Sequence, residues 1–110
     1  MHAAVMADDV AALKDLLTRG DAPDARDHLG FTPLHLAAQQ WSVPAAEALL
    51  DAGATVDAEN SFGNTPLFVA VFNSNGRGEL IDLLRSHGAD PFHANKSGQT
   101  PVRLARLIAN

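Results

Sequence analysis

A four-residue motif, Gly-x-Thr-Pro, occurs three times in the chain and each time precedes an apolar stretch. The three copies are Gly30-Phe31-Thr32-Pro33, Gly63-Asn64-Thr65-Pro66 and Gly98-Gln99-Thr100-Pro101. Their threonines are 33 and 35 residues apart, so a unit is repeated and its later copy contains two additional residues. A period of roughly 20 to 50 residues is typical of solenoids, in which each unit packs mainly on its neighbours. The repeat therefore constrains the fold more than any other feature.

The same order of signals follows each motif and predicts a pair of helices with a turn. After Thr32 these signals are an apolar stretch over residues 33–40, a polar break over 41–44, a second stretch over 44–52, and a Gly-Ala pair. The Thr32 hydroxyl can cap the first helix, and proline suits its first turn because the amide there has no helical partner. Gly53 and Gly88 follow leucine-rich stretches, where a left-handed residue commonly ends a helix. Each unit is therefore expected to be a helix-turn-helix.

Parts of the same unit are recognisable at both ends of the chain. Residues 8–20 predict a second helix, because Asp8 and Asp9 favour its N-terminus and Gly20 ends it. Residues 2–7 are interpreted as what remains of the preceding first helix, and residues 101–108 predict a first helix alone. We therefore expect one domain over residues 1–110. It would consist of a partial unit (1–30), two full units (31–63 and 64–98) and a second partial unit (99–110).

With these features the chain resembles the ankyrin repeat family, whose signature is Thr-Pro-Leu-His-x-Ala. Residues 32–37 match every fixed position of that signature, whereas Phe68 replaces the histidine in the next copy and Arg103 replaces it in the last. The resemblance implies an all-α ankyrin repeat solenoid of stacked helix-turn-helix units with β-hairpin-like connecting fingers. About two full units would be flanked by partial units. It also implies that the His35 imidazole bridges backbone groups of adjacent units and has no catalytic role.

Composition and motifs disfavour several classes of function. The chain is 46% hydrophobic, contains no cysteine and has a formal net charge of −5, which disfavours nucleic-acid binding. Its apolar runs are too short to span a membrane and its start lacks a secretory signal, so we expect a cytoplasmic protein. We find no phosphate-binding glycine loop, nucleophile elbow or zinc-protease helix, and so predict no enzyme activity and no cofactor. His87, Asp90 and His93 are close in sequence, but Gly88 and Pro91 indicate an exposed turn, so no metal site is predicted.

The resemblance implies that a protein partner binds the concave face, which the finger tips and first helices would form. Among its large side chains, Leu29, Phe31, Phe62 and Phe72 are the preferred anchors, with Trp41 beside them, because desolvated aromatic groups dominate binding energy. In the alternative, Phe31 and Phe62 pack against neighbouring fingers, and Trp41, where the family usually has glycine, covers the edge of the core. The full predicted set is Arg26, His28, Leu29, Phe31, Gln39, Gln40, Trp41, Glu59, Ser61, Phe62, Asn64, Phe72, Asn73, Arg77, Lys96, Gln99 and Arg106.

The two additional residues of the later copy lie within residues 72–79. A short lengthening of a loop costs little entropy and can persist without a function. We also expect it to lift Arg77 away from the stack, where its guanidinium could engage a carboxylate. Residues 72–81 and 95–110 resemble small bacterial ankyrin proteins that serve as immunity partners of secreted toxins.

The predicted function is a non-enzymatic protein–protein interaction module that is monomeric apart from its partner. A narrower form is an immunity protein that neutralises a toxin by occlusion. Residues 1–55 hold 8 acidic and 3 basic residues, which would steer this half toward a basic target. The alternative is a structural or self-associating ankyrin fragment that assembles through its incomplete C-terminal unit, where Val102, Leu107 and Ile108 are available.

Overall fold

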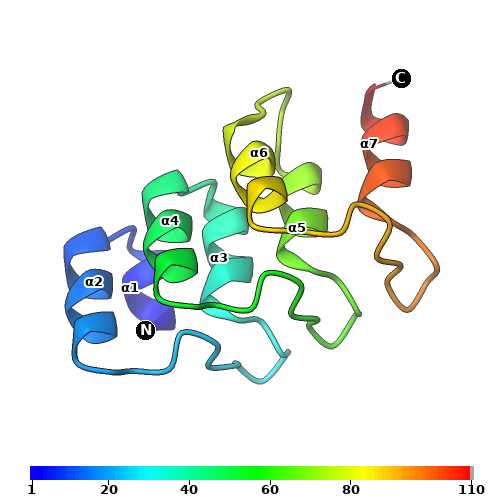
Figure 1. The fold of residues 1–110 in the computed structure, drawn as a ribbon. Helices are drawn as coiled ribbons and strands as arrows, with labels where there is room; N and C mark the ends of the chain where they lie inside the picture. The colour runs from blue at the N-terminus through cyan, green and yellow to red at the C-terminus, as the bar shows by residue number, and fades with distance from the viewer. Residues whose placement is uncertain (110) are drawn as a thin grey trace.

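The computed structural model describes residues 1–109. They form seven α-helices in two rows, which are joined by turns and loops (Figure 1). The first helices of the units are α1 (His2–Met6), α3 (Pro33–Gln40), α5 (Pro66–Phe72) and α7 (Pro101–Ala109). The second helices are α2 (Val10–Thr18), α4 (Val43–Asp51) and α6 (Glu79–Ser86). No strand occurs within residues 1–109, so the predicted all-α solenoid of helix-turn-helix units is confirmed. No helix among them is long and apolar enough to cross a membrane.

The first helices begin at the Thr-Pro pairs, as the motif predicts. The hydroxyl of Thr32 accepts a hydrogen bond from the His35 N–H at 3.3 Å, and that of Thr65 accepts one from the Phe68 N–H at 3.4 Å. Thr100 caps α7 in the same way. Each proline occupies the first turn of its helix. Backbone N–H groups there have no partner within the helix, so the missing N–H of proline costs no hydrogen bond. Helix position is therefore encoded locally in each unit.

The junctions between paired helices contain residues in the left-handed backbone region. Asp8, Trp41 and Asn75 have φ values of 53°, 55° and 49°. Asp and Asn adopt this conformation more readily than other non-glycine residues, whereas a bulky side chain is strained there. Trp41 is therefore the exceptional residue of the series. Next to it, Ser42 caps α4 and donates its hydroxyl hydrogen to Asp8 at 2.6 Å, which joins two successive junctions.

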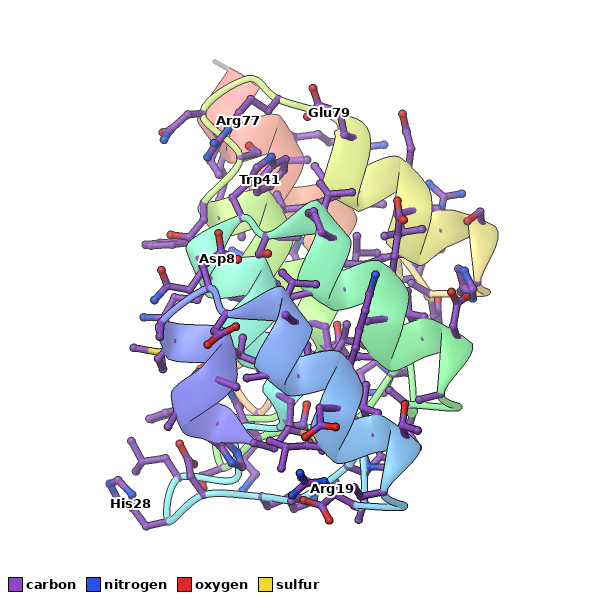
Figure 2. All side chains as sticks on the ribbon, turned by 90° about the vertical axis from the view of Figure 1, so that its left-hand side faces the viewer. Asp8, Arg19, His28, Trp41, Arg77 and Glu79 are labelled. Atoms are coloured by element: carbon purple, nitrogen blue, oxygen red, sulfur yellow. The ribbon has the colours of Figure 1, made fainter. Side chains whose placement is uncertain are left out.

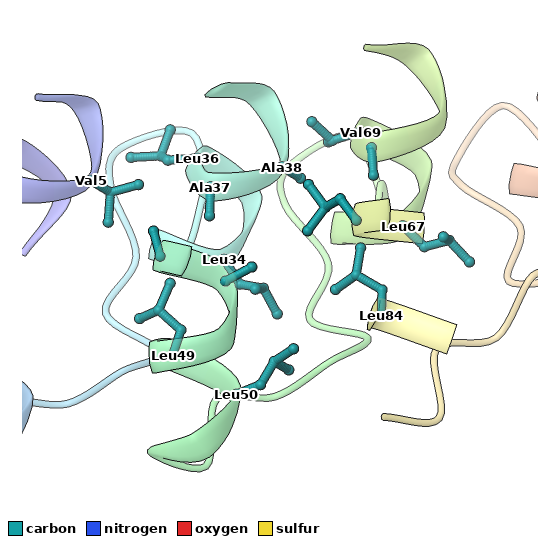
Figure 3. Packing of buried hydrophobic residues seen from close by; sticks show 14 of the residues in the cluster. Val5, Leu34, Leu36, Ala37, Ala38, Leu49, Leu50, Leu67, Val69 and Leu84 are labelled. Atoms are coloured by element: carbon teal, nitrogen blue, oxygen red, sulfur yellow. The ribbon is translucent and has the colours of Figure 1, made fainter. Parts of the chain in front are cut away.

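The core is a continuous apolar layer between the two rows of helices and across successive units (Figure 3). Leu34, Leu49 and Leu67 are completely or almost completely buried, and buried alanines such as Ala37 and Ala46 let neighbouring helices approach closely. The leucines of the seven helices are buried or half-buried, except Leu107 on α7. Ala105, also on α7, is exposed, because no second helix covers α7 within residues 1–109.

Hairpin-like loops, here called fingers, project from one edge of the stack and precede α3, α5 and α7 (Figure 1). Each finger closes on itself, as where the Asn60 N–H donates to the Asn64 carbonyl at 3.1 Å. Neighbouring fingers are joined by the Ser61 N–H to the Leu29 carbonyl at 2.9 Å, and by the Lys96 N–H to the Phe62 carbonyl at 3.1 Å. The fingers are therefore built from backbone hydrogen bonds without forming regular strands.

Candidate functional site

A pocket of about 320 Å³ opens where the fingers meet helices α3 and α5. Fingers and first helices thus share one surface, which we call the concave face. Five predicted partner-binding residues line the pocket together with two residues that the prediction did not include. Its lining consists of Phe31, Gln39, Asn64, Phe68, Val69, Phe72 and Asn73.

Phe72 is the most accessible apolar group of this pocket. Its side chain is 67% exposed at the last position of α5. The next residue, Asn73, ends the helix and donates its side-chain amide to the Val69 carbonyl at 2.9 Å, which fixes the direction in which the chain leaves. Phe31 also lines the pocket, but it is half-buried and packs against the core. The ring of Phe31 is therefore partly covered by the core, whereas most of the Phe72 ring is accessible to solvent.

His35 is buried and contacts two residues that line the pocket, the ring of Phe31 and the carbonyl of Asn64. Its Nδ1 accepts a hydrogen bond from the Thr32 N–H at 3.1 Å, and its Nε2 donates to the Asn64 carbonyl at 2.7 Å. Burial lowers the pKa of His35 below its ordinary value, although the bond to Asn64 opposes this shift. The imidazole is therefore neutral, with its proton on Nε2. The predicted bridge between units is confirmed.

A second pocket, of about 260 Å³, lies further along the stack on α7. Gln99 and Arg106 were predicted to contact a partner, whereas Arg103 and Leu107 were not; these four residues line it. Arg103 is exposed, and its guanidinium makes a long contact of 3.5 Å to the Gly98 carbonyl. This end of the concave face is therefore positively charged.

The polar groups of three predicted residues form hydrogen bonds or ion pairs that join neighbouring fingers. The Arg26 guanidinium donates to the carbonyls of Gly30 and Glu59. The Glu59 carboxylate pairs with the His93 imidazole at 2.7 Å, and the Ser61 hydroxyl donates to the Leu29 carbonyl at 2.7 Å. These contacts give Arg26, Glu59 and Ser61 a structural role. They also account for His93, which with His87 and Asp90 had been considered as a metal ligand.

Four other predicted residues present side chains at the exposed ends of the fingers. Leu29 and Phe62 are 41% and 53% exposed, so neither is fully covered by a neighbouring finger. His28 and Lys96 are exposed, and Figure 2 shows His28 at the end of the first finger. These tips are accessible to a partner, but they line neither of the two concave pockets.

The junction residues are placed differently from the prediction. Arg77 does not project away from the stack, because its guanidinium lies over the Trp41 ring, 4.4 Å from the centroid (Figure 2). Its Nε and Nη2 also donate to the carbonyls of Ser74 and Asn73 at 2.9 and 3.0 Å. Trp41 is half-buried and packs against the core, as in the edge-covering alternative. Gln40 is exposed and contacts the Met6 sulfur at 3.5 Å.

Two of the lining residues that the prediction missed share a recognisable signal. Phe68 and Arg103 stand three residues after their threonines, where the signature has histidine, and this substitution marks positions that line the concave face. Phe92 was also missed, although its side chain is 70% exposed. Its backbone N–H donates to the Asp90 carboxylate at 2.9 Å, and no sequence signal singled it out.

Comparison with known proteins agrees with this architecture. The family model described as ankyrin repeats in three copies matches residues 1–95, and the chain belongs to the ankyrin repeat family. It is similar to the 2-5A-dependent ribonuclease of Mus musculus, with 36% identity over 105 residues, which cover 94% of this chain and 10% of that protein. The chain thus spans about a tenth of the length of this curated relative. Ankyrin repeats generally mediate protein–protein interaction and constitute a non-enzymatic interaction module.

Proposed function

We propose that this chain is a protein-binding module without enzyme activity, and that its partner occupies the concave face. The observation that carries the proposal is Phe72, a large apolar side chain that lines an open pocket yet remains 67% exposed. Covering such a ring contributes about 1.5 to 3 kcal/mol. Aromatic groups in partly enclosed pockets are typical energetic centres of protein interfaces.

The remaining lining supports a binding role and offers no group suited to covalent chemistry. The pocket presents the side-chain amides of Gln39, Asn64 and Asn73 around its apolar floor. Amides can orient a partner through hydrogen bonds without the desolvation cost of a charge. His35, which contacts the Phe31 ring, is buried and uses both nitrogens within the fold. An apolar centre with a polar rim is the arrangement expected of an interface.

Comparative capture from the native cell tests the proposal. Wild type, Phe72→Ala and Phe92→Ala would be used as baits, and the captured proteins compared by quantitative mass spectrometry. Phe92 is the matched control because it is equally exposed but lines neither pocket. We expect partners that are lost with Phe72→Ala and retained with Phe92→Ala. Partners that bind both variants equally would contradict binding at the concave face.

The narrower form of the proposal is a cytoplasmic immunity protein, monomeric apart from the toxin that it occludes. The resemblance of residues 72–81 and 95–110 to bacterial immunity proteins supports it. The chain would form one domain of units 1–30, 31–63, 64–98 and 99–110, whose last residue lies outside the described part. Co-expression with the product of a neighbouring gene is the test. Failure of every toxin-like neighbour to bind would remove this form and leave the broader proposal intact.

A second candidate function is self-association through α7. Leu107 and Ile108 are 65% and 48% exposed on this helix, and residues of α5, α6 and α7 line a depression of about 90 Å³. Light scattering across a concentration series should then show a mass that rises with concentration, and Ile108→Ser should reduce the rise. A constant monomer mass would contradict this candidate.

A further inference from the structure

Three residues of each concave pocket occupy equivalent positions in successive units. They stand one before, three after and seven after the capping threonine, although the first pocket is also lined by Phe31 and Gln39 of the preceding unit. In the first pocket these are Asn64, Phe68 and Phe72, and in the second they are Gln99, Arg103 and Leu107. The position three after the threonine is the one that changes in chemistry, from an aromatic ring to a guanidinium. A ligand that crosses both units therefore meets an apolar site followed by a cationic one.

Charges are divided between the two rows of helices. The first helices α1, α3, α5 and α7 contain no Asp or Glu within their bounds, whereas the second helices α2, α4 and α6 contain five. These five are Asp15, Glu47, Asp51, Glu79 and Asp82. On the concave face, Arg103 lies beside the second pocket, and Lys96 is exposed on the adjacent finger. The protein is acidic as a whole, yet the concave face is basic around the second pocket.

The geometry of stacked helices sets the distance between the two sites. Packed helices have axes about 8 to 10 Å apart, and α5 packs directly against α7. An extended peptide advances roughly 3.3 Å per residue, so about three residues separate groups that reach equivalent positions on the two helices.

From these observations we infer the chemistry of the partner. We propose that the concave face binds an extended segment of a protein that carries a large apolar side chain and a carboxylate about three residues apart. The apolar group enters the pocket of Phe68 and Phe72, and the carboxylate pairs with Arg103. The inference rests on the proposed function. It differs from the basic target predicted from the acidic residues of 1–55, because the second pocket is lined by arginine and contains no carboxylate among its lining residues.

Selection from a displayed library of random decapeptides tests the inference on the intact chain. The immobilised targets are wild type, Phe72→Ala, Arg103→Glu and Arg85→Glu. The last is a matched charge reversal on α6, at an exposed residue outside both concave pockets. Wild type and Arg85→Glu should both enrich peptides with an apolar and an acidic residue about three positions apart. Arg103→Glu should keep the apolar preference and replace the acidic residue with a basic one.

Binding of defined peptides provides the quantitative readout. The probe is the peptide Gly-Ser-Phe-Gly-Ser-Asp-Gly-Ser, and its control has Lys in place of Asp. NMR titration detects even weak binding and maps it onto the amides of the chain. We expect the Lys control to bind wild type on the order of tenfold more weakly, and Arg103→Glu to reverse this order.

The outcomes separate this inference from the proposed function. Peptides that require Phe72 but ignore the charge at position 103 would overturn the inference and leave concave-face binding intact. Peptides that bind Phe72→Ala as well as wild type would contradict both. Absence of any shift with the Phe–Asp peptide would overturn the inference, while the capture experiment still decides the proposed function. Tighter binding of a short single-stranded RNA than of the Phe–Asp peptide, lost in Arg103→Glu, would also overturn it, because the cationic pocket would then select phosphate.

Discussion

The Nε2 of His35 donates a hydrogen bond to the backbone carbonyl oxygen of Asn64 at 2.7 Å, although 29 positions separate the two residues. This bond joins the first helix of one unit to the finger of the next. Asn64 in turn accepts a hydrogen bond from the Asn95 side chain on the following finger at 2.8 Å. In the next unit Phe68 stands in place of the histidine and has no ring nitrogen to make an equivalent link.

We expect His35→Ala to lower the free energy of unfolding by about 1 to 3 kcal/mol, because the buried Thr32 N–H and Asn64 carbonyl lose their partner. Urea titration followed by circular dichroism measures the loss. His28→Ala is the matched control, since His28 is exposed on a finger tip. Equal stabilities of the two variants would show that the imidazole bridge contributes nothing.

Stability should decrease as the pH falls through the ordinary range of histidine. Burial lowers the pKa of His35 in the folded state, so below its ordinary value of about 6.5 the unfolded chain takes up a proton before the folded chain does. The stabilising effect of the neutral ring is thus present above pH 6.5 and is lost progressively at lower pH, down to the folded-state pKa. Urea midpoints between pH 7.5 and 5 measure this slope. It should be smaller in His35→Gln than in His28→Gln, and identical slopes would contradict the assignment.

The contact between Arg77 and Trp41 should be measurable by a double-mutant cycle. The guanidinium lies 4.4 Å from the ring centroid at a partly exposed site, where such contacts are worth about 0.5 to 1 kcal/mol. We expect a coupling energy of that size when the free energies of unfolding of wild type, Arg77→Ala, Trp41→Ala and the double variant are compared. Because Trp41 is the single tryptophan, its fluorescence should also change in Arg77→Ala. Additive effects without a fluorescence change would indicate that the two side chains do not interact.

Two glycines with similar backbone angles should respond differently to alanine. Gly53 and Gly63 have φ values of 91° and 74°, so alanine is strained at both. A Cβ on Gly53 meets no atom within 4 Å, whereas one on Gly63 would lie 2.8 Å from the Lys96 backbone nitrogen. We expect a loss of about 1 kcal/mol for Gly53→Ala and a clearly larger one for Gly63→Ala, which must also separate two fingers. Thermal unfolding of both variants compares them directly, and equal melting temperatures would argue against close packing of the fingers.

Local sequence signals account for most of the secondary structure. Thr32 and Pro33 place the start of α3 because a hydroxyl cap and a fixed φ act within one turn. Gly53 and Gly88 likewise end helices through their own backbone freedom, with φ values of 91° and 92°. The spacing of such signals was sufficient to predict the repeated unit and the solenoid.

The candidate site was predictable only in part. Phe31, Asn64 and Phe72 were anticipated because the family resemblance assigns fingers and first helices to one face, and all three line the first pocket. Arg77 was misplaced, because its contact with Trp41 joins residues 36 positions apart and depends on how two junctions stack. Sequence patterns within one unit carry no information about that distance.

The amino-acid sequence alone thus determines the period and the approximate helix boundaries, since caps, prolines and glycines act over a few residues. The starts of α2 and α4, at Val10 and Val43, differ by one or two residues from those predicted, and the bridging histidine was implied by the family resemblance. Stacking of the units, in contrast, determines which residues share a surface. It brings Phe68 and Arg103 into equivalent pockets, and separates the concave first helices from the acidic second helices. It also directs Arg77 onto an aromatic ring instead of toward solvent. These arrangements depend on packing between segments more than 30 residues apart, and their free energy is therefore a property of the assembled stack.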